Sequence, residues 1–244
     1  MARKQAQGRS RNQLLERLSS VFAGFAHEVR NPLSTIGLNL SLIQEDFTNA
    51  ETVRDKRTGR RVEVLQSEVK RMQAILDEFL HFVRGPEVTP RPVELNALLE
   101  SLVEFMAPEA NDQGISLRFY SDQDVGLFEV DPDLFRAMIV NLVRNALQAC
   151  SKGDEVLVST LRQGTEVLIR VTDTGPGMTP ETQKNAFQPY FSTKKGGTGL
   201  GLPIVRRVVE EHGGSIHLSS ELGKGTQFTL LFPTQRLLPE GGDE

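Results

Sequence analysis

Apolar residues recur at every third or fourth position over two long segments in the first third of the chain. One segment runs from Leu14 to Phe47 and the other from Val62 to Val83. This period places the apolar side chains on one face of an α-helix, so each segment predicts a long amphipathic helix. The polar stretch 48–61, which includes Gly59, predicts the connection between them.

A hairpin of two amphipathic helices buries little apolar surface by itself. The seam that it leaves uncovered favours pairing with a second copy of the chain, which would give a homodimer built on a four-helix bundle. We therefore expect the first part of the chain to dimerise.

The rest of the chain mixes helical and strand periods. Helices are predicted over 95–106, 131–150 and 200–212, and strands over 115–120, 127–130, 156–161, 167–171, 216–219 and 227–232. Asp131 followed by Pro132 is typical of a helix start. The predicted fold class is α+β: a helical hairpin followed by an α/β sandwich with one layer of helices on one mixed sheet.

Chain breakers divide the sequence into domains. Gly85 and Pro86 end the second helix, and Pro90 and Pro92 keep the following residues extended. We expect a basic N-terminal arm at 1–11, a helical hairpin domain at 12–85, a hinge at 86–92, a second domain at 93–234 and a flexible tail at 235–244.

Composition narrows the classes of protein to consider. The 244 residues carry a net charge of −4, which gives no general field for nucleic acid. Cys150 is the only cysteine, so neither an intrachain disulfide nor a cysteine-rich metal site can form, as is typical of a reducing compartment. No run approaches the roughly 18 apolar residues of a membrane span. We expect a cytoplasmic chain with no membrane segment of its own, and leave open an upstream sensor or membrane domain.

The first candidate for chemistry is His27 on the first predicted helix. At about 100° per residue it lies opposite the apolar seam, so it faces water or a docked domain. Glu28 is placed to accept a proton from its Nδ1 and leave Nε2 as a nucleophile, and Asn31 follows one turn later on the same face. Pro32 removes one helical hydrogen bond and favours a bend.

A pair of neutral amides is the second candidate. Asn141 and Asn145 are four residues apart on the helix that follows Asp131, so both side chains lie on one face. Amide oxygens suit a hard cation that also takes phosphate oxygens, as Mg2+ does. Two solvated asparagines are the alternative for the pair taken alone.

Glycines around a carboxylate are the third candidate. Asp173 follows an apolar strand, and Gly175 and Gly177 allow the backbone to turn close to a ligand. Phosphates would repel a carboxylate, so Asp173 fits an amino group such as N6 of adenine. Residues 196–201 lead into a helix whose free N–H groups and positive end suit an anion. Neither the P-loop pattern nor the dinucleotide-binding fingerprint occurs.

These groups follow one another in the order of a known family. Residues 25–33, Phe-Ala-His-Glu-Val-Arg-Asn-Pro-Leu, resemble the H-box of sensor histidine kinases. The N, G1, F and G2 boxes of the ATP-binding domain of these enzymes resemble Asn145, residues 173–177, residues 187–191 and residues 197–201. The resemblance covers about residues 14–233, and five independent boxes in order are very improbable by chance.

The resemblance implies a fold and roles in phosphotransfer. The fold would be a dimeric hairpin followed by an ATP-binding domain of the Bergerat type. His27 would be the phosphoacceptor, Glu28 its base, and Asn31 a residue that orients water for dephosphorylating the partner.

The resemblance also implies a site for ATP and Mg2+. Asn145 would bind Mg2+ with help from Asn141, and Asp173 would bind adenine in a pocket shaped by Gly175 and Gly177. The phosphates would be contacted by Lys194, Gly197, Thr198, Gly199, Leu200 and Gly201.

Two features depart from the common pattern of the family. Gln148 stands where many members have a basic residue near the phosphates, and the lid between Phe191 and Gly196 is very short. Both features are similar to the nitrogen-regulation type of sensor kinase. Phe187 and Phe191 fit lid anchors and core aromatics equally well.

The implied function is autophosphorylation of His27 with ATP, followed by transfer to an aspartate on the receiver domain of a response regulator, with regulator phosphatase activity besides. One alternative is an ATPase resembling gyrase, MutL or Hsp90 proteins, in which ATP drives a conformational change. Another is a dimeric docking scaffold or dedicated phosphatase with ATP as a ligand only. The hairpin that carries His27 argues against the first alternative, whereas Asn31 keeps the second open.

Overall fold

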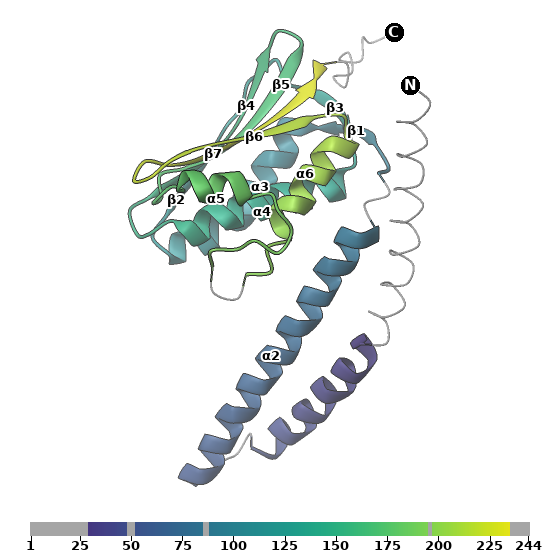
Figure 1. Cartoon of the computed structure of the whole chain (residues 1–244), viewed down its shortest axis with the longest axis vertical. Coiled ribbons are helices and arrows are strands. Elements are labelled where there is room, and N and C mark those ends of the chain that lie inside the picture. Colours follow the sequence, from purple (N-terminus) through teal and green to yellow (C-terminus); the bar gives the residue numbers. More distant parts are fainter. Residues whose placement is uncertain (1–28, 48–51, 85–87, 195–196, 235–244) are drawn as a thin grey trace. The chain divides into compact units, whose positions relative to one another are not determined.

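The computed structural model of this chain describes residues 29–47, 52–84, 88–194 and 197–234. Internal contacts divide the chain into two compact units, residues 1–85 and 86–244. In its described residues the first unit contains two helices, and the second contains a layer of strands with helices against it (Figure 1). None of the helices in the described ranges combines the length and apolar character that spanning a membrane requires.

The first unit pairs a helix over residues 29–46 with α2 (Val53–Arg84). Leu33 and Leu40 of the first helix, and Phe47 directly after it, are half-buried. Val62, Val69 and Leu80 of α2 are buried. These positions follow the three-and-four spacing read from the sequence. The apolar seam therefore holds the two helices together.

The second helix begins well before Val62, so the prediction that 48–61 is all connection was wrong. Thr52 starts the helix, because its Oγ1 accepts a hydrogen bond from the backbone N–H of Asp55 at 3.1 Å. Gly59 is buried inside α2, where an added Cβ would lie 3.3 Å from Cβ of Phe47. The glycine allows close approach of two helices here rather than a turn.

The second unit is built on a five-stranded sheet with the order β2-β4-β5-β7-β6. Its strands are β2 (Ser116–Tyr120), β4 (Glu155–Gln163), β5 (Glu166–Asp173), β6 (Ser215–Glu221) and β7 (Gly225–Pro233). β2 and β4 are parallel and the other pairs are antiparallel, so the sheet is mixed. A separate antiparallel pair joins β1 (Arg91–Glu94) to β3 (Leu127–Val130).

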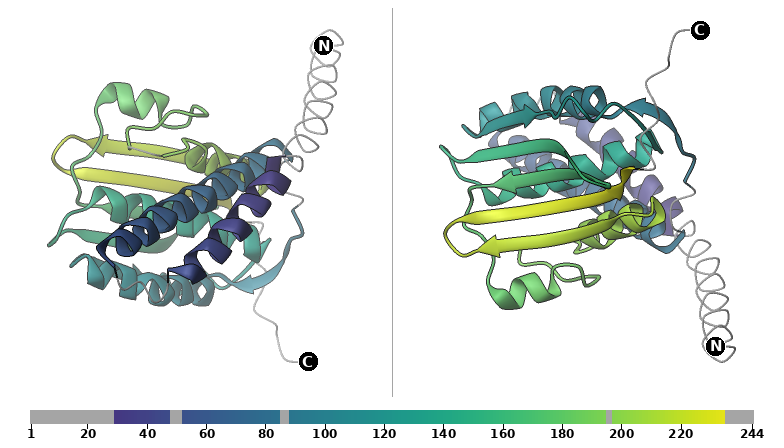
Figure 2. Two further views of the ribbon diagram at one scale, coloured as in Figure 1. Left: turned by 90° about the horizontal axis from the view of Figure 1, so that it is seen from below. Right: turned by 90° about the horizontal axis from the view of Figure 1, so that it is seen from above.

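Three helices cover one face of the sheet (Figures 1 and 2). They are α3 (Leu95–Asp112), α4 (Pro132–Ala149) and α6 (Gly201–Glu211). Alternate residues of the strands turn toward these helices, as Phe228, Leu230 and Phe232 do in β7, and are buried. The α+β class with a helical hairpin and a mixed sheet is therefore confirmed.

Three local differences from the sequence analysis have physical causes. α3 continues past 106 to Asp112, because Pro108 lies on its exposed face, where the carbonyl that loses a partner can bond to water. The short helix α5 (Pro180–Asn185) has too few residues to show a period. Arg91 and Pro92, assigned by sequence to the hinge, lie in β1.

Asp131 joins several segments at the start of α4. Its Oδ1 accepts hydrogen bonds from two backbone N–H groups in the first turn of α4, both at 3.1 Å, and its Oδ2 accepts one from Thr89 at 2.9 Å. Its own N–H donates to Nε2 of His212 at 3.0 Å, so Nδ1 of that ring carries the proton and bonds to the carbonyl of Val208 at 2.7 Å. One aspartate thus ties α4, α6 and the chain before β1 together.

Replacing Asp131 by Ala should lower the free energy of unfolding by about 2 kcal/mol, because it removes a helix cap and leaves the N–H of Thr89 unpaired. Burial alone would raise the pKa of Asp131, but its backbone N–H partners hold it below the ordinary value of 3.8. Its contribution is therefore present above pH 3.8 and is lost as the pH falls through the folded-state value.

Urea unfolding followed by circular dichroism, at neutral pH and in acid, measures both effects. Asp133→Ala, at an exposed position of the same turn, is the matched control and should change stability little. An Asp131→Ala protein as stable as the wild type at neutral pH would contradict the role of the cap.

Candidate functional site

The carboxylate of Asp173 lies at the end of β5, where β7 runs beside it. Its Oδ1 accepts hydrogen bonds from the backbone N–H groups of Gly175 at 3.0 Å and Thr226 at 3.2 Å. Burial raises the pKa of Asp173, and these two N–H groups oppose that rise. Among the described residues both hydrogen bonds of the carboxylate go to Oδ1. Oδ2 therefore remains to accept a donor from a ligand.

Gly175 and Gly177 shape the backbone next to this carboxylate. An added Cβ on Gly175 would lie 3.1 Å from Oδ1 of Asp173 and 3.4 Å from the carbonyl oxygen of Ala149. Gly177 has a φ of 68°, and an added Cβ there would collide with the carbonyl of Glu221. The first glycine is needed for close packing against α4, and the second for a left-handed turn.

The amides of α4 point toward a lysine from the segment that precedes α6. Nδ2 of Asn145 donates to Oδ1 of Asn141 at 2.9 Å, so the two amides are joined as their spacing predicts. Nζ of Lys194 donates to Oδ1 of Asn145 at 3.2 Å, to its backbone carbonyl at 3.3 Å, and to Oε1 of Gln148 at 2.9 Å. An ammonium group can only donate, so the atom that Asn145 turns toward it is the amide oxygen.

Lys194 and Asp173 belong to one electrostatic site. The lysine side chain is exposed overall, but loss of water around its ammonium lowers the pKa, and the negative charge of Asp173 opposes that change. The same attraction is one of the influences that lower the pKa of Asp173 against the effect of burial. The carboxylate and the amides of α4 therefore face a common region.

The glycines before α6 hold the backbone close to its neighbours. Gly199 has a φ of 69°, and an added Cβ would lie 2.5 Å from the carbonyl carbon of Tyr190. An added Cβ on Gly197 would collide with Oγ of Ser192. At the start of α6, an added Cβ on Gly201 would lie 2.8 Å from both amide atoms of Asn141. Glycine at 201 thus leaves room for the amide pair.

Thr198 and Leu200 have structural contacts of their own. Oγ1 of Thr198 accepts a hydrogen bond from the backbone N–H of Leu200 at 3.3 Å. The side chain of Leu200 is 1% exposed and belongs to the buried part of the unit. Of the residues assigned to the phosphates, Leu200 can therefore offer a ligand only its backbone.

Phe187, which the sequence offered as a lid anchor or a core aromatic, and Cys150 have mainly structural settings. Phe187 packs edge-to-face on Phe228, with ring centroids 6.3 Å apart, and the guanidinium carbon of Arg206 lies 4.1 Å from its ring centroid. Cys150 caps the end of α4 and is half-buried. Burial raises the pKa of its thiol to about 11, so it stays protonated and unreactive at neutral pH.

The sequence analysis missed the part that the β6–β7 turn plays at this site. Thr226 donates its backbone N–H to Asp173, and an added Cβ on Gly225, whose φ is 108°, would collide with the carbonyl of Asp173. The glycines at 223 and 225, between the strands predicted over 216–219 and 227–232, indicate a hairpin turn, although Gly225 and Thr226 already belong to β7. Sequence spacing carries no signal that this turn lies beside Asp173, because that contact comes from the register of β5 with β7.

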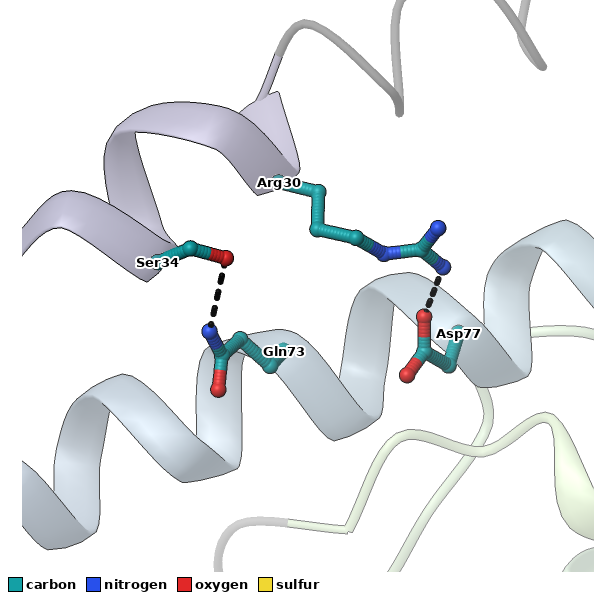
Figure 3. A network of polar contacts seen from close by, with 4 residues as sticks. All are labelled: Arg30, Ser34, Gln73 and Asp77. Carbon is teal, nitrogen blue, oxygen red and sulfur yellow. Dashed lines mark hydrogen bonds and ion pairs between the residues drawn. The ribbon is translucent and has the colours of Figure 1, made fainter. Parts of the chain in front are cut away.

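The phosphoacceptor half of the candidate site lies on the hairpin. His27 and Glu28 fall outside the described residues, whereas Asn31 is exposed on the helix described over residues 29–46. Two polar contacts join this helix to α2: Arg30 forms an ion pair with Asp77, and Nε2 of Gln73 donates to Oγ of Ser34 at 3.5 Å (Figure 3). These exposed polar contacts join the helix carrying Asn31 to α2 and add little to the apolar seam that holds the two helices together.

The donor atoms at this site suit Mg2+ bound together with phosphates. Within the described ranges there is no group of three or more His, Cys, Asp or Glu that could hold a metal ion. Neutral oxygens of α4 nevertheless converge on a cation, the ammonium of Lys194. Mg2+ is commonly held by few protein oxygens and completed by water and phosphate, which fits this set.

Two families match the two parts of the chain. Residues 17–87 match the family described as His Kinase A (phospho-acceptor) domain. Residues 130–236 match the family described as Histidine kinase-, DNA gyrase B-, and HSP90-like ATPase.

Two bacterial kinases align with nearly the whole chain. It is 35% identical over 234 residues to sensor histidine kinase ZraS of Escherichia coli (strain K12), which covers 95% of this chain and 49% of that protein. It is 31% identical over 223 residues to sporulation kinase C of Bacillus subtilis (strain 168), which covers 91% of this chain and 50% of that protein. The chain thus spans about half the length of the curated relatives it matches.

Solved structures are similar over both units. Full-length ShkA in complex with AMPPNP aligns with a TM-score of 0.74 and 27% identity, covering 88% of this chain and 45% of that one. Histidine kinase ThkA in complex with the response regulator TrrA aligns with a TM-score of 0.65 and 25% identity, covering 94% of this chain and 66% of that one.

Replacing Asp173 by Asn should weaken ADP binding by about 100-fold while leaving the protein folded. The amide oxygen can keep the hydrogen bonds from Gly175 and Thr226. If Asp173 binds adenine as the family resemblance implies, the amide NH2 would then meet the adenine amino group, donor against donor, at a loss of about 3 kcal/mol. Because burial raises the pKa of Asp173, the buried charge opposes folding at neutral pH, so the variant should be at least as stable as the wild type.

Calorimetric titration with ADP, and urea unfolding of the same samples, measure the two effects. Asp154→Asn, which changes a charge near the same site, is the control for electrostatics alone. If Asp173→Asn bound ADP as tightly as the wild type, the carboxylate would have no part in binding adenine.

Proposed function

We propose, on the premise that the chain belongs to the sensor histidine kinases, that it is an ATP-dependent protein-histidine kinase. It phosphorylates its own His27 and passes the phosphoryl group to an aspartate on the receiver domain of a response regulator. The observation that carries this proposal is the presence, in one chain, of a phosphoacceptor-type hairpin and a histidine-kinase-type ATPase unit. We assign the hairpin domain to 12–85 and the ATP-binding domain to 93–234. Of the hinge expected at 86–92, Thr89 and Arg91–Pro92 are already bonded within the second unit.

The geometry supports roles for the residues of the nucleotide site. Oδ2 of Asp173 accepts a hydrogen bond from N6 of adenine, since Oδ1 is already engaged by backbone N–H groups. Asn145 binds Mg2+ through its Oδ1, and Asn141 holds the amide in that orientation. The N–H groups of Gly197 and Leu200 are bonded to the carbonyl of Lys194 and to Oγ1 of Thr198. The phosphates are contacted by Nζ of Lys194 and by the N–H groups of the segment 197–201, of which these two must first exchange partners.

Bound Mg2+ neutralises phosphate charge, and positioning supplies most of the remaining catalysis. Glu28 accepts the proton of Nδ1 of His27, so Nε2 attacks the γ-phosphorus in line. The bond from phosphorus to the β–γ bridging oxygen breaks and ADP leaves. The new N–P bond is labile, which suits onward transfer to a carboxylate.

A regulator can dock on the exposed face of the first helix. Asn31 is exposed there, and Leu38 and Leu42, at 63% and 53% exposed, lie within about two to three turns on the same face. Apolar side chains next to an exposed amide are typical of a partner surface. The position of Asn31 also supports a regulator phosphatase activity, in which its amide orients the attacking water.

The apolar faces of the hairpin support a homodimer. Leu33 and Leu40 are half-buried against α2, but Ile36 and Ile43, seven residues apart beside them, are 49% and 42% exposed. On α2 a similar exposed stripe contains Leu65 and Met72, at 54% and 47%. Exposed apolar positions at heptad spacing on both helices fit a second hairpin.

Leu65→Glu should convert the dimer to a monomer, because it would place a charge in the buried centre of the bundle. Leu38→Glu is the matched control, since it changes another exposed leucine of the hairpin that lies outside the stripe, and it should leave the dimer intact. Light scattering at a series of concentrations distinguishes the two forms. A dimeric Leu65→Glu protein would place the interface elsewhere.

Two finer assignments follow from the sequence. Gln148 and the short segment between Phe191 and Gly196 favour the nitrogen-regulation type of sensor kinase. The single cysteine favours a cytoplasmic location.

Incubation with γ-labelled ATP and Mg2+ tests the proposed function. The wild type should acquire label that is stable in base and labile in acid, and should lose it to a receiver domain. His27→Gln should bind ADP as the wild type does but acquire no label. His81→Gln controls for loss of a histidine elsewhere on the hairpin. Labelled His27→Gln protein would exclude His27 as acceptor, whereas free phosphate with unlabelled wild type would identify an ATPase instead.

A further inference from the structure

Three oxygen atoms of α4 surround the ammonium group of Lys194. They are Oδ1 of Asn145 at 3.2 Å, the backbone carbonyl of the same residue at 3.3 Å, and Oε1 of Gln148 at 2.9 Å. All three are uncharged. A cluster of neutral oxygens around one point is the environment that a cation occupies, and here the cation is part of the chain.

One of these oxygens is also the atom that the proposed function assigns to the metal. We propose that Lys194 and the divalent cation compete for Oδ1 of Asn145, so that Mg2+ entering with the nucleotide displaces the ammonium from α4. This inference rests on the proposed function, because it needs Asn145 to be the metal ligand. Lys194 is then a positioning residue: it sets the Mg2+ concentration at which the nucleotide binds.

Electrostatics makes the two cations exclusive. A magnesium ion lies about 2.1 Å from its oxygen ligands, and Nζ of Lys194 lies 3.2 Å from Oδ1 of Asn145. Sharing that oxygen would hold three positive charges within about 5 Å of one another, in a place from which water is partly removed. The metal also draws electron density from the amide oxygen and weakens it as an acceptor. The ammonium therefore leaves when the metal arrives.

Gln148 is what makes the lysine position possible. Its Oε1 makes the shortest of the three contacts and is not shared with the proposed metal ligand. A basic side chain at 148 would repel the ammonium instead of accepting its hydrogen bond. The positive charge near the phosphates is thus carried by a side chain that can move away from α4, toward phosphate oxygens, once it is displaced.

Calorimetric titration of the full chain with ADP at a series of Mg2+ concentrations tests the proposal. Lys194→Met should lower the Mg2+ concentration for half-maximal ADP binding by about 3- to 10-fold, because the metal no longer displaces an ammonium. Gln148→Leu, which removes only the holding contact, should shift the midpoint in the same direction and by less. Lys184→Met, an exposed lysine of α5, is the control and should match the wild type.

Two further measurements separate this role from others. In the Asn145→Ala background, Lys194→Met should no longer shift the Mg2+ midpoint, because the shared oxygen is gone. With EDTA in place of Mg2+, Lys194→Met should bind ADP more weakly than the wild type, because the ammonium then serves the phosphates alone. A midpoint that is unchanged or raised in Lys194→Met overturns the proposal. A wild type that binds no ADP at any Mg2+ concentration overturns the proposed function instead.

Discussion

The second unit depends on one constraint on α4, which must pack on the sheet and present polar groups at the same time. One face of the helix packs in the core through side chains that are at most 1% exposed: Phe135, Met138, Ile139 and Leu142. Asn141, Asn145 and Gln148 follow at helical spacing on another face. Because the apolar face cannot rotate without losing its packing, the direction of the amides is fixed by the core.

The sequence predicted the features that depend on local spacing. The amide pair of Asn141 and Asn145 required only the period of a helix, and their side chains are hydrogen-bonded in the structure. The turn after Asp173 required only glycines at 175 and 177. The predicted start of α2 was wrong, because polar residues and glycine also occur inside helices. Gly59 lies inside α2 because it packs close to Phe47, and local spacing does not show this contact between the two helical segments.

Contacts between distant segments could not be predicted in this way. Thr226 reaches Asp173 because β5 pairs with β7 in one register, and a shift of one residue would turn the neighbouring side chains to the other face. Lys194 meets Gln148 through a segment that has no regular period. In both cases the residues were visible in the sequence, but their partners were decided by tertiary packing. The roles of His27 and Glu28 stay predictions, because both lie outside the described residues.

The anchoring of the chain before β1 limits how the proposed phosphotransfer can be arranged. The candidate nucleotide site and His27 belong to different units of the chain, so the proposed phosphotransfer involves both units. Thr89 is bonded to Asp131 through its backbone N–H, and Arg91–Glu94 is paired with β3, so both belong to the second unit. The rotation expected of a hinge at 86–92 must then be absorbed before Thr89. Residues from Thr89 onward therefore belong to the second unit, and the hinge expected from the sequence ends earlier than residue 92.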